Sequence, residues 1–430
     1  MKTEIRNLNA TLGTYYPAFF DLYLNTDKSM EKLSITAMTD VERSAFFHEY
    51  IHFLQDVSTT TGLFNIYVIN EYFRLVATQY ATQNPFVLPV QLRNDNFGNV
   101  QLNQHINLSI FGERREYPYS TVVITKIKQE DKATALSKSK GINRIPTIKF
   151  ESHNEWWEFG YKEIMESMAY ILQRLCTKAY TSPEYPYLVA EKMAEFINST
   201  FAKSLLNVLA LCDVSLMTDQ PGAYFVDYIQ RITKEGRSIA KPEEIYDDFY
   251  SIVGVDCNGI QTSSLAHYTT LYNAAKQALK SYIAIPCIRQ KLNKWIDMVF
   301  DIGYNIRDKY RYFFLELARD GDIMSNKTFN AIFYTIGSPL MHNNKGAYGR
   351  FPSHPSDYGD VSQYLLAILP IVESFNNGKT ECYMKPFCIS SGRKTDDRCK
   401  TPWLKKCELR LCPVATIWKH RKLAANRIEC

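Results

Sequence analysis

Two histidines and a glutamate near the N-terminus have the types and spacing of a hydrolytic metal site. His48 and His52 belong to the run His48-Glu49-Tyr50-Ile51-His52. On a helix this spacing puts both imidazoles on one face, about one turn apart, where both can reach a single zinc ion. Zinc lowers the pKa of a bound water to about 7, and Glu49 is placed to take its proton. The pattern predicts His48 and His52 as zinc ligands and Glu49 as the general base.

The surrounding residues predict a buried helix. Thr39 lies three residues before Glu42, the pattern of a capping box, so we expect a helix from there to about Ser58 and a second one over roughly 64–83. Two buried histidines and a glutamate without a partner are costly, and a metal ion removes that cost. Burial on nearly every side is expected because uncharged, mostly bulky residues flank the motif: Phe46, Phe47, Tyr50, Ile51, Phe53 and Leu54.

The segment HEYIHFLQDVSTTTGL resembles the active-site helix of zincin metallopeptidases, in particular the thermolysin-like gluzincins, which carry His-Glu-x-x-His followed by an aspartate. Asp56 stands at that place, four residues after His52 and on the same helix face. The resemblance implies a zinc peptidase in which Asp56 holds the helix or a ligand in place by hydrogen bonds. Alternatively, Asp56 faces solvent.

A catalytic zinc site needs a third protein ligand and an open fourth position. The segment 164–169 (IMESMA) resembles the one that supplies the glutamate ligand in gluzincins such as the aminopeptidase-N group, which implies Glu166 as that ligand. The gap from His52 to Glu166 is far longer than in those enzymes, so the residues between them must loop out. Glu166 also lies outside the main apolar face of its helix, and a surface carboxylate paired with Lys162 or Arg174 is the alternative.

Other residues are further candidates around the metal. Glu163 is the alternative glutamate ligand, and His153 and His267 are less favoured third ligands. The loop segment Ser353-His354-Pro355-Ser356 is similar to a His-Pro segment near the active site of some gluzincin-like membrane and heat-shock endopeptidases. That resemblance implies His354, or Arg350 beside it, as a donor that stabilises the oxyanion. A proline-rich turn without chemistry is the alternative.

The chain is expected to form an α+β, predominantly helical protein with a zincin-like core over residues 1–375. Its 430 residues with 46% hydrophobic content can bury a large core. Residues 1–38 look strand-like, ending in an alternating stretch over 32–38, and residues 343–360 form a long loop. Alternating β-branched stretches predict a strand-rich insert over about 86–150: FVLPVQL, NVQLNQHINLSIF, STVVITKI and RIPTIKF. Helices are expected near 155–180, 186–212, 222–235, 264–282 and 287–318.

Residues 376–430 are expected to form a separate Cys-rich basic module. Four thiolates can close a tetrahedral structural zinc site that staples a segment too small for a core of its own. The spacings do not match the usual C-x₂-C knuckle, so an iron–sulfur cluster and free or paired cysteines remain alternatives. Five cysteines lie within 31 residues of one another: Cys382, Cys388, Cys399, Cys407 and Cys412.

This module also carries the positive charge of the chain. It holds 13 Lys and Arg against 5 Asp and Glu, whereas the remainder holds 37 against 40. Basic residues interleaved with Trp403 and Trp418 can bind nucleic acid, although such a run is more often a solvated face. No apolar run is long enough for a signal peptide or a membrane span, so we expect a cytoplasmic protein without a membrane partner.

Together these observations predict a zinc-dependent metallopeptidase that acts on a peptide or protein substrate. The alternative is a non-enzymatic helical binding protein whose metal-stapled basic tail contacts nucleic acid or an acidic partner. A substitution of Glu49 by glutamine separates the two, because only the enzyme would lose a function with it.

Overall fold

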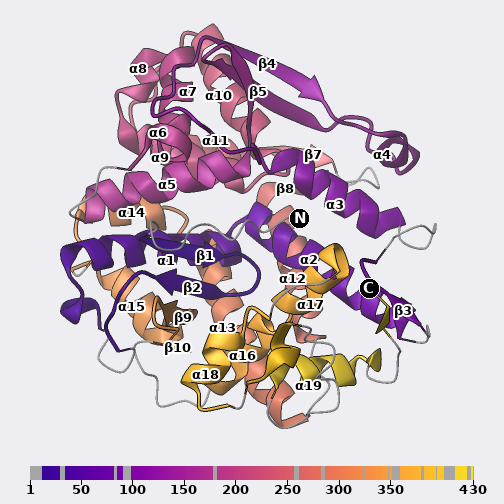
Figure 1. Cartoon of the computed structure of the whole chain (residues 1–430). Helices are drawn as coiled ribbons and strands as arrows, with labels where there is room; N and C mark the ends of the chain where they lie inside the picture. Colours follow the sequence, from indigo (N-terminus) through magenta and orange to yellow (C-terminus); the bar gives the residue numbers. More distant parts are fainter. Residues whose placement is uncertain are drawn as a thin grey trace.

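Helices dominate this structure, and several small sheets accompany them (Figure 1). This arrangement confirms the predicted α+β, predominantly helical class. The computed structural model describes residues 12–29, 34–81, 85–90, 98–177, 182–255, 261–281, 286–323, 325–346, 348–350, 359–378, 382–393, 395–400, 412–423 and 428–429.

The N-terminal half of the described chain begins with a hairpin, followed by two long helices and the insert. Its elements are β1 (Gly13–Tyr16), β2 (Asp21–Leu24), a 3₁₀ turn (Ile35–Ala37), α1 (Asp40–Ser58), α2 (Thr60–Tyr80), β3 (Phe86–Val87), α3 (Gly98–Ile110), β4 (Lys126–Asp131), α4 (Ala135–Ser139), β5 (Pro146–Ser152), β6 (Glu155–Phe159), α5 (Tyr161–Cys176), α6 (Glu184–Tyr187), α7 (Val189–Ile197), α8 (Ser199–Ala202) and α9 (Leu205–Leu216).

The second half is mostly helical and returns to the N-terminal hairpin. Its elements are α10 (Pro221–Lys234), α11 (Glu243–Tyr250), β7 (Val253–Val255), β8 (Gln261–Ser263), α12 (Ser264–Lys280), α13 (Pro286–Asp308), α14 (Phe313–Asp320), α15 (Lys327–Ile336), β9 (Leu340–Asn343), β10 (Tyr348–Gly349), α16 (Gly359–Leu366), α17 (Leu369–Asn377), α18 (Lys385–Ser390), a 3₁₀ turn (Asp397–Lys400), α19 (Pro413–His420) and β11 (Ile428–Glu429).

Helix α1 begins where its sequence predicts. The Thr39 hydroxyl accepts from the Glu42 N–H at 3.2 Å, and the Glu42 carboxylate accepts from the Thr39 N–H at 2.7 Å, which completes a capping box. Every residue from Ser44 to Ser58 is buried. The helix ends at Thr59, whose extended backbone interrupts it and whose hydroxyl caps α2 by accepting from the Gly62 N–H at 3.0 Å.

Neighbouring helices fix the far end of α1. Arg307 of α13 donates to the backbone carbonyl of Ser58, and its guanidinium lies 2.8 Å from the carboxylate of Asp213. A cation at the C-terminal end of a helix is attracted by the partial negative charge of the last backbone carbonyls. Gly303 lets α13 cross α1 closely, because a Cβ at that position would lie 2.1 Å from the Val57 carbonyl oxygen. These contacts hold α1 in one position relative to the helices around it.

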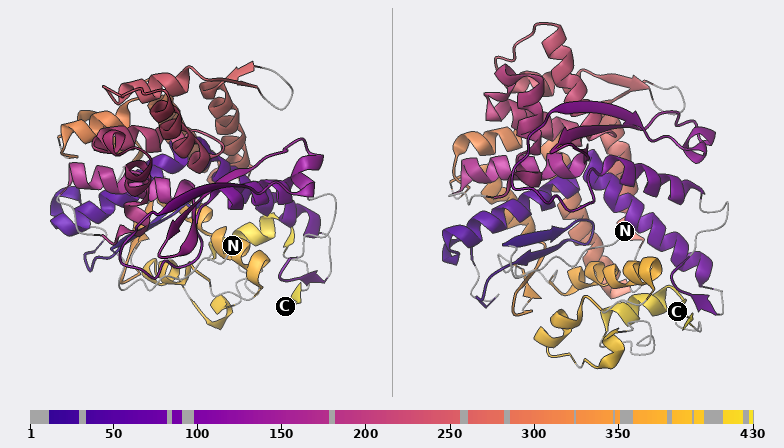
Figure 2. Two further views of the ribbon diagram at one scale, coloured as in Figure 1. Left: turned by 90° about the horizontal axis from the view of Figure 1, so that it is seen from above. Right: turned by 45° about the horizontal axis from the view of Figure 1, so that its top comes forward.

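A four-stranded sheet lies beside α1 in the order β1-β2-β9-β10. Strands β1 and β2 pair antiparallel, β2 and β9 parallel, and β9 and β10 antiparallel. Helix α1 contacts β1, β2, α2, α5 and α13. In the ribbon views strands β4 and β5 and helices α6–α11 lie on one side of α1, and helices α16–α19 on the other (Figures 1 and 2).

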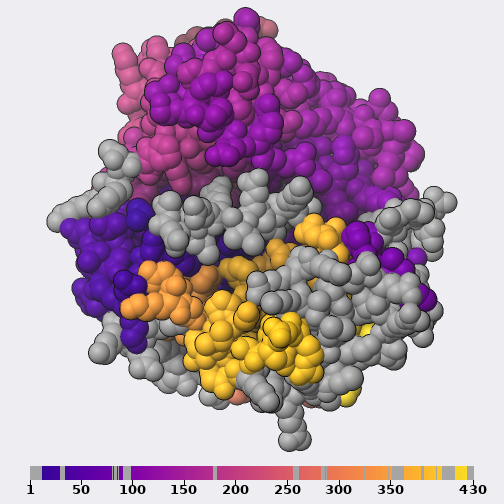
Figure 3. Space-filling view, viewed as in Figure 1, coloured from indigo at the N-terminus to yellow at the C-terminus, as the bar shows by residue number. Residues whose placement is uncertain are grey.

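The C-terminal segment packs against the rest of the chain. The Tyr383 hydroxyl donates to the Asp21 carboxylate of β2 at 2.9 Å, and Trp418 is 1% exposed with its ring against Phe375. Strand β11 pairs in parallel with β3. On the face shown in space-filling form, this segment and the β1–β2 hairpin occupy the lower half, below the insert (Figure 3). A separate module over 376–430 stays a prediction.

The insert contains a helix where a strand was predicted. NVQLNQHINLSIF was predicted to be a strand, and this was wrong: the segment lies mostly in α3. Its apolar residues also recur every four positions, at Leu102, Ile106 and Ile110, which is the stripe of a helix. Strands β4, β5 and β6 form an antiparallel sheet in that order. Strand β5 lies mostly in the predicted stretch RIPTIKF, whereas β4 overlaps the predicted stretch STVVITKI only at its last two residues and continues to Asp131.

Several further boundaries differ from expectation. The helix expected near 186–212 is divided among α6, α7, α8 and α9, and the one expected near 287–318 is divided between α13 and α14. The described part of 32–38 is a 3₁₀ turn rather than a strand, because the Ser34 hydroxyl accepts from the Ala37 N–H and closes a turn. The helix expected from 155 starts only at Tyr161, because residues 155–159 pair with β5. Among the described helices, none combines the length and apolar character needed to cross a bilayer.

Candidate metal centre

Two imidazoles and one carboxylate meet between α1 and α5. His48 Nε2 lies 3.2 Å and His52 Nε2 3.4 Å from the same oxygen of Glu166, and the two Nε2 atoms are 3.1 Å apart. Ligand atoms that share one tetrahedral zinc at about 2.0–2.1 Å lie roughly 3.3 Å from one another. The three side chains therefore fit a zinc ion. In the part of the chain that the structure describes, no other three His, Cys, Asp or Glu side chains bring ligand atoms within 4.8 Å of one another.

Gln55 orients one of the two histidines. Its side-chain oxygen lies 2.7 Å from His52 Nδ1, and its side-chain nitrogen donates to the Met165 carbonyl of α5 at 3.1 Å. Because an amide oxygen only accepts, Nδ1 carries a proton, and in the neutral imidazole the lone pair of His52 is on Nε2. Gln55 was not predicted from the sequence. The signal that the sequence contains is an amide three residues after His52, on the same helix face and among apolar residues.

His48 is held differently. Its Nδ1 is buried without a hydrogen-bond partner in the described structure, and the ring of Tyr187 packs against its imidazole with centroids 5.5 Å apart. The polar contacts of this ring are therefore on the Nε2 side, which faces His52 and Glu166. This is the side on which a metal ligand needs its lone pair.

The three groups influence one another electrostatically. Burial raises the pKa of Glu166, but the neighbouring His52 and His48 outweigh it and hold that pKa well below the usual range. Burial lowers the pKa of His52, but Glu166, Glu49 and Gln55 outweigh it and raise the pKa to about 9. Glu166 is thus a carboxylate at neutral pH, the form that binds a cation.

Glu49 lies between the imidazoles and strand β1. Burial raises the pKa of its carboxyl group, and the charges of His48 and His52 oppose that rise. The backbone N–H of Tyr15 hydrogen-bonds this carboxyl group. Gly13 leaves room for it, since a Cβ there would lie 2.7 Å from Glu49 Cγ. Strand β1 thereby positions the residue predicted to be the general base.

Asp56 connects α1 to the β1–β2 hairpin. It is 3% exposed and accepts from the Tyr15 hydroxyl at 2.9 Å and from the Ala18 N–H at 2.7 Å. Ala18 has a φ of 65°, so this contact also stabilises a left-handed turn. Of the two expectations for Asp56, the structure supports hydrogen bonding within the protein. Asp56 hydrogen-bonds the β1–β2 hairpin, whereas the ring of His52 hydrogen-bonds Gln55.

Glu163 has a different environment from Glu166. Its carboxylate accepts from the Gly160 N–H at 3.0 Å, the Glu113 N–H at 3.2 Å and the Tyr185 hydroxyl at 2.7 Å, so it caps the start of α5. Burial raises its pKa to about 7. These partners leave it away from the histidine pair, and the structure does not support Glu163 as a metal ligand.

The remaining candidate residues lie elsewhere. His153 Nε2 is 3.0 Å from the Thr121 carbonyl, and His267 Nε2 is 2.8 Å from the Asp219 carboxylate. Arg350 donates to the carbonyls of residues 336 and 338, near the end of α15, and lies over the ring of Trp295. These bonds use its Nε and Nη2 groups, and the oxyanion role of Arg350 stays a prediction. His354 lies outside the described residues.

The described cysteines of the C-terminal segment lie near one another without forming a closed ligand set. The Cys382 N–H donates to the Cys399 carbonyl at 2.7 Å, and the Cys412 sulfur accepts from the Ala415 N–H at the start of α19. Burial raises the pKa of Cys382 to about 12, and the nearby thiols of Cys412, Cys388 and Cys399 add to that rise. Among described residues no three of these sulfurs lie within 4.8 Å of one another. Cys407 lies outside the described residues.

Comparisons of this chain with protein-family models, with curated proteins and with solved structures find no match.

Proposed function

We propose that this chain is a zinc-dependent metallopeptidase with its metal between α1 and α5. The observation that carries the proposal is the spacing of 3.1–3.4 Å among His48 Nε2, His52 Nε2 and one Glu166 oxygen. Two imidazole nitrogens and a carboxylate oxygen at this separation match the spacing of ligand atoms around one tetrahedral zinc. The set of two histidines and one glutamate is typical of catalytic zinc, which leaves one position for water or substrate.

Each protein group has a distinct role in the proposed reaction. His48, His52 and Glu166 would hold the zinc ion, which would supply an acidified water and polarise the substrate carbonyl. Glu49 accepts the proton of that water at its carboxylate and later delivers it to the leaving amine. Burial of Glu49, which raises its pKa, favours this exchange near neutral pH.

An extended peptide is the substrate that the surroundings favour. Strand β1 is the edge of its sheet among the described residues, with β2 on one side only. A peptide that pairs with such an edge gains backbone hydrogen bonds regardless of its sequence. Because β1 also contacts Glu49 through Gly13 and Tyr15, the pairing would bring a peptide bond close to the base. We infer that β1, rather than the strands of the insert, is the edge that receives substrate.

The test is hydrolysis of a mixed library of quenched fluorescent peptides by the purified full chain. We expect cleavage that stops when a chelator removes the metal and returns when zinc is added. Cleavage that persists in chelator, or a zinc-loaded protein that cleaves no peptide in the library, would contradict the proposal.

Gly13 offers a second test of the base. In Gly13→Ala the new Cβ would lie 2.7 Å from Glu49 Cγ and 3.0 Å from Oε1, so the carboxylate must move. We expect kcat to fall about 10–100-fold with zinc content unchanged, since a displacement near 1 Å can cost that much. Gly98→Ala is the matched control, because no atom lies within 4 Å of its new Cβ. Equal activity of both variants would exclude the proposed position of Glu49.

A second, structural zinc in the C-terminal segment remains a separate proposal. Its support is that the thiols of Cys388, Cys399 and Cys412 lie close enough to Cys382 to raise the pKa of its thiol. Binding would draw these sulfurs into one tetrahedron and stabilise the segment. Cys388→Ala is expected to lose one zinc ion per chain and retain the other. Unchanged zinc content would contradict it.

A further inference from the structure

A cavity of about 290 Å³ opens at the start of α2, away from the three metal-site side chains. Its walls come from four places in the chain: the first turns of α2, the end of α3, residues 142–145 and residues 218–220. None of the metal-site residues lines it. The cavity is therefore a feature that hydrolysis as proposed above does not use.

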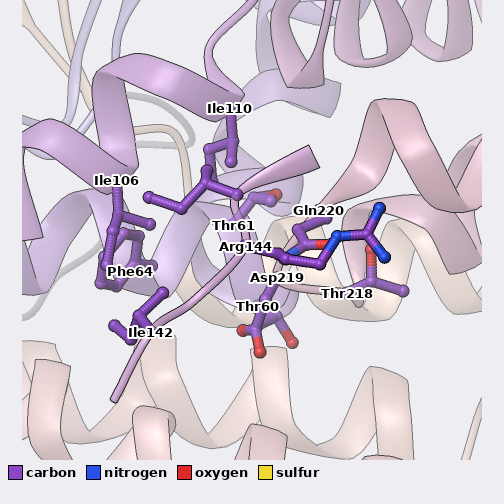
Figure 4. Close-up of a pocket in the computed structure, with 11 residues that line it drawn as sticks. Thr60, Thr61, Phe64, Ile106, Ile110, Ile142, Arg144, Thr218, Asp219 and Gln220 are labelled. Atoms are coloured by element: carbon purple, nitrogen blue, oxygen red, sulfur yellow. The ribbon is translucent and has the colours of Figure 1, made fainter. Parts of the chain in front are cut away.

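The two ends of the cavity differ in chemistry (Figure 4). One end carries the apolar side chains of Phe64, Ile106 and Ile142, and the other gathers Arg144 with residues 218–220. Small-molecule sites in proteins have this composition: a largely apolar wall with a few polar groups that fix the orientation of the ligand. The volume is at the small end of the usual range and corresponds to roughly ten non-hydrogen atoms at about 30 Å³ each.

Two hydrogen-bond donors at the cavity lack partners. Thr60, the first residue of α2, is 1% exposed, and its hydroxyl oxygen is buried with no hydrogen bond in the described structure. Arg144 forms no ion pair within 4.0 Å to any described residue, although its charge acts on the carboxyl groups of both Asp227 and Asp131. A buried hydroxyl without a partner costs free energy that a ligand oxygen would recover.

The acidic residue at the cavity already has a partner. Asp219 lies 2.8 Å from His267 Nε2. That hydrogen bond raises the pKa of His267 and favours its protonated form. The groups left for a ligand include two donors without a partner, the Thr60 hydroxyl and the Arg144 guanidinium, and the second is a permanent cation.

We propose that this cavity binds a small carboxylic acid with an apolar chain. The carboxylate accepts from Arg144 and from the Thr60 hydroxyl, and the chain lies against Phe64, Ile106 and Ile142. An acid of this kind derives either from an acyl chain or from the C-terminal residue of a peptide. Octanoate and N-acetylleucine represent the two sources and are close to the size that the cavity admits.

The experiment is an NMR titration of the full chain labelled at isoleucine methyl groups. Octanoate is expected to shift the methyl signals of Ile106, Ile110 and Ile142, with a Kd in the millimolar range or tighter for a ligand of about ten atoms. Titration with N-acetylleucine then tells which source fits better. Octan-1-ol, which has the chain without the charge, is the matched ligand and should bind at least about tenfold more weakly.

Three variants decide whether this site is responsible. Arg144→Gln, at an exposed position, is expected to weaken octanoate at least about tenfold and to leave octan-1-ol unchanged. Thr60→Val removes the hydroxyl at constant shape and should weaken octanoate several-fold. Arg114→Gln alters an arginine outside the cavity and should leave the affinity for octanoate unchanged.

Equal affinity for octanoate and octan-1-ol, equal binding by wild type and Arg144→Gln, or no methyl shift with either acid would overturn the proposal. Zinc content and peptide hydrolysis should be unaffected in Arg144→Gln, so this test is independent of the metallopeptidase proposal.

Discussion

Glu49→Gln is expected to abolish peptide hydrolysis while the protein keeps its zinc. The amide has nearly the shape of the carboxylate but cannot accept the proton of the attacking water. Loss of a general base typically costs about 10²–10⁴-fold in rate. Glu49 is not among the three groups whose ligand atoms converge, so metal affinity should change little. The measurement is kcat/KM on a cleaved peptide together with zinc content by atomic emission.

A control substitution shows whether the loss of any glutamate carboxylate lowers the rate of hydrolysis. Glu71→Gln alters a glutamate on α2 that pairs with Arg74 at the surface, and it should leave both rate and metal unchanged. If Glu49→Gln retained full hydrolysis, the base would have to be another group. If neither variant nor wild type cleaved any peptide, the alternative of a binding protein would gain support.

Glu166→Ala is expected to remove the zinc itself. The substitution takes away one of three ligands and leaves His48 and His52 facing each other across 3.1 Å. Loss of even an outer hydrogen-bond partner of a ligand typically costs 10–100-fold in metal affinity, so loss of a ligand should cost at least about 100-fold. Competition with a chelating dye measures the affinity, and hydrolysis should fall in parallel.

Glu155→Ala is the control for this variant. Glu155 is the exposed first residue of β6, the strand that precedes Gly160 and α5 in the sequence. It should bind zinc as wild type does. A Glu166→Ala protein that bound zinc with unchanged affinity would contradict the proposed ligand set and would redirect attention to another acidic group. Both variants leave the Thr39–Glu42 cap of α1 intact.

The part of the site that could be predicted from sequence is the part encoded locally. Thr39 and Glu42 define the start of α1, and the four-residue spacing of His48 and His52 then places their imidazoles on one face. These features need only the geometry of one helix. The convergence of Glu166 with them was also expected, although on a resemblance of six residues rather than on geometry.

What could not be predicted depends on contacts between distant segments. Glu163 and Glu166 lie one turn apart on α5, and only the cap that Glu163 forms with Gly160 and Glu113 separates their roles. Gln55 acts through the Met165 carbonyl, which is 110 residues away in the chain. For Asp56 the sequence left two possibilities open, because its partners belong to a hairpin turn that no local pattern specifies.

The α3 segment shows the same limit in the fold. Its apolar residues satisfy both a period of two and a stripe at every fourth position, and packing against α2 decides in favour of the helix. By contrast, β5 and β6 form a hairpin whose pairing follows from a two-residue turn at His153 and Asn154, both with positive φ. The alternation of apolar and polar residues therefore predicted a strand correctly where a tight turn joined it to the next strand, and failed in the α3 segment.

Diffraction from crystals of the zinc-loaded chain, measured on both sides of the zinc absorption edge, can locate the zinc ion that we propose for His48, His52 and Glu166. We expect an anomalous peak between α1 and α5, about 2.0–2.2 Å from both Nε2 atoms and from a Glu166 oxygen. A zinc-loaded crystal with no peak at that position, or with imidazoles turned away from each other, would contradict it.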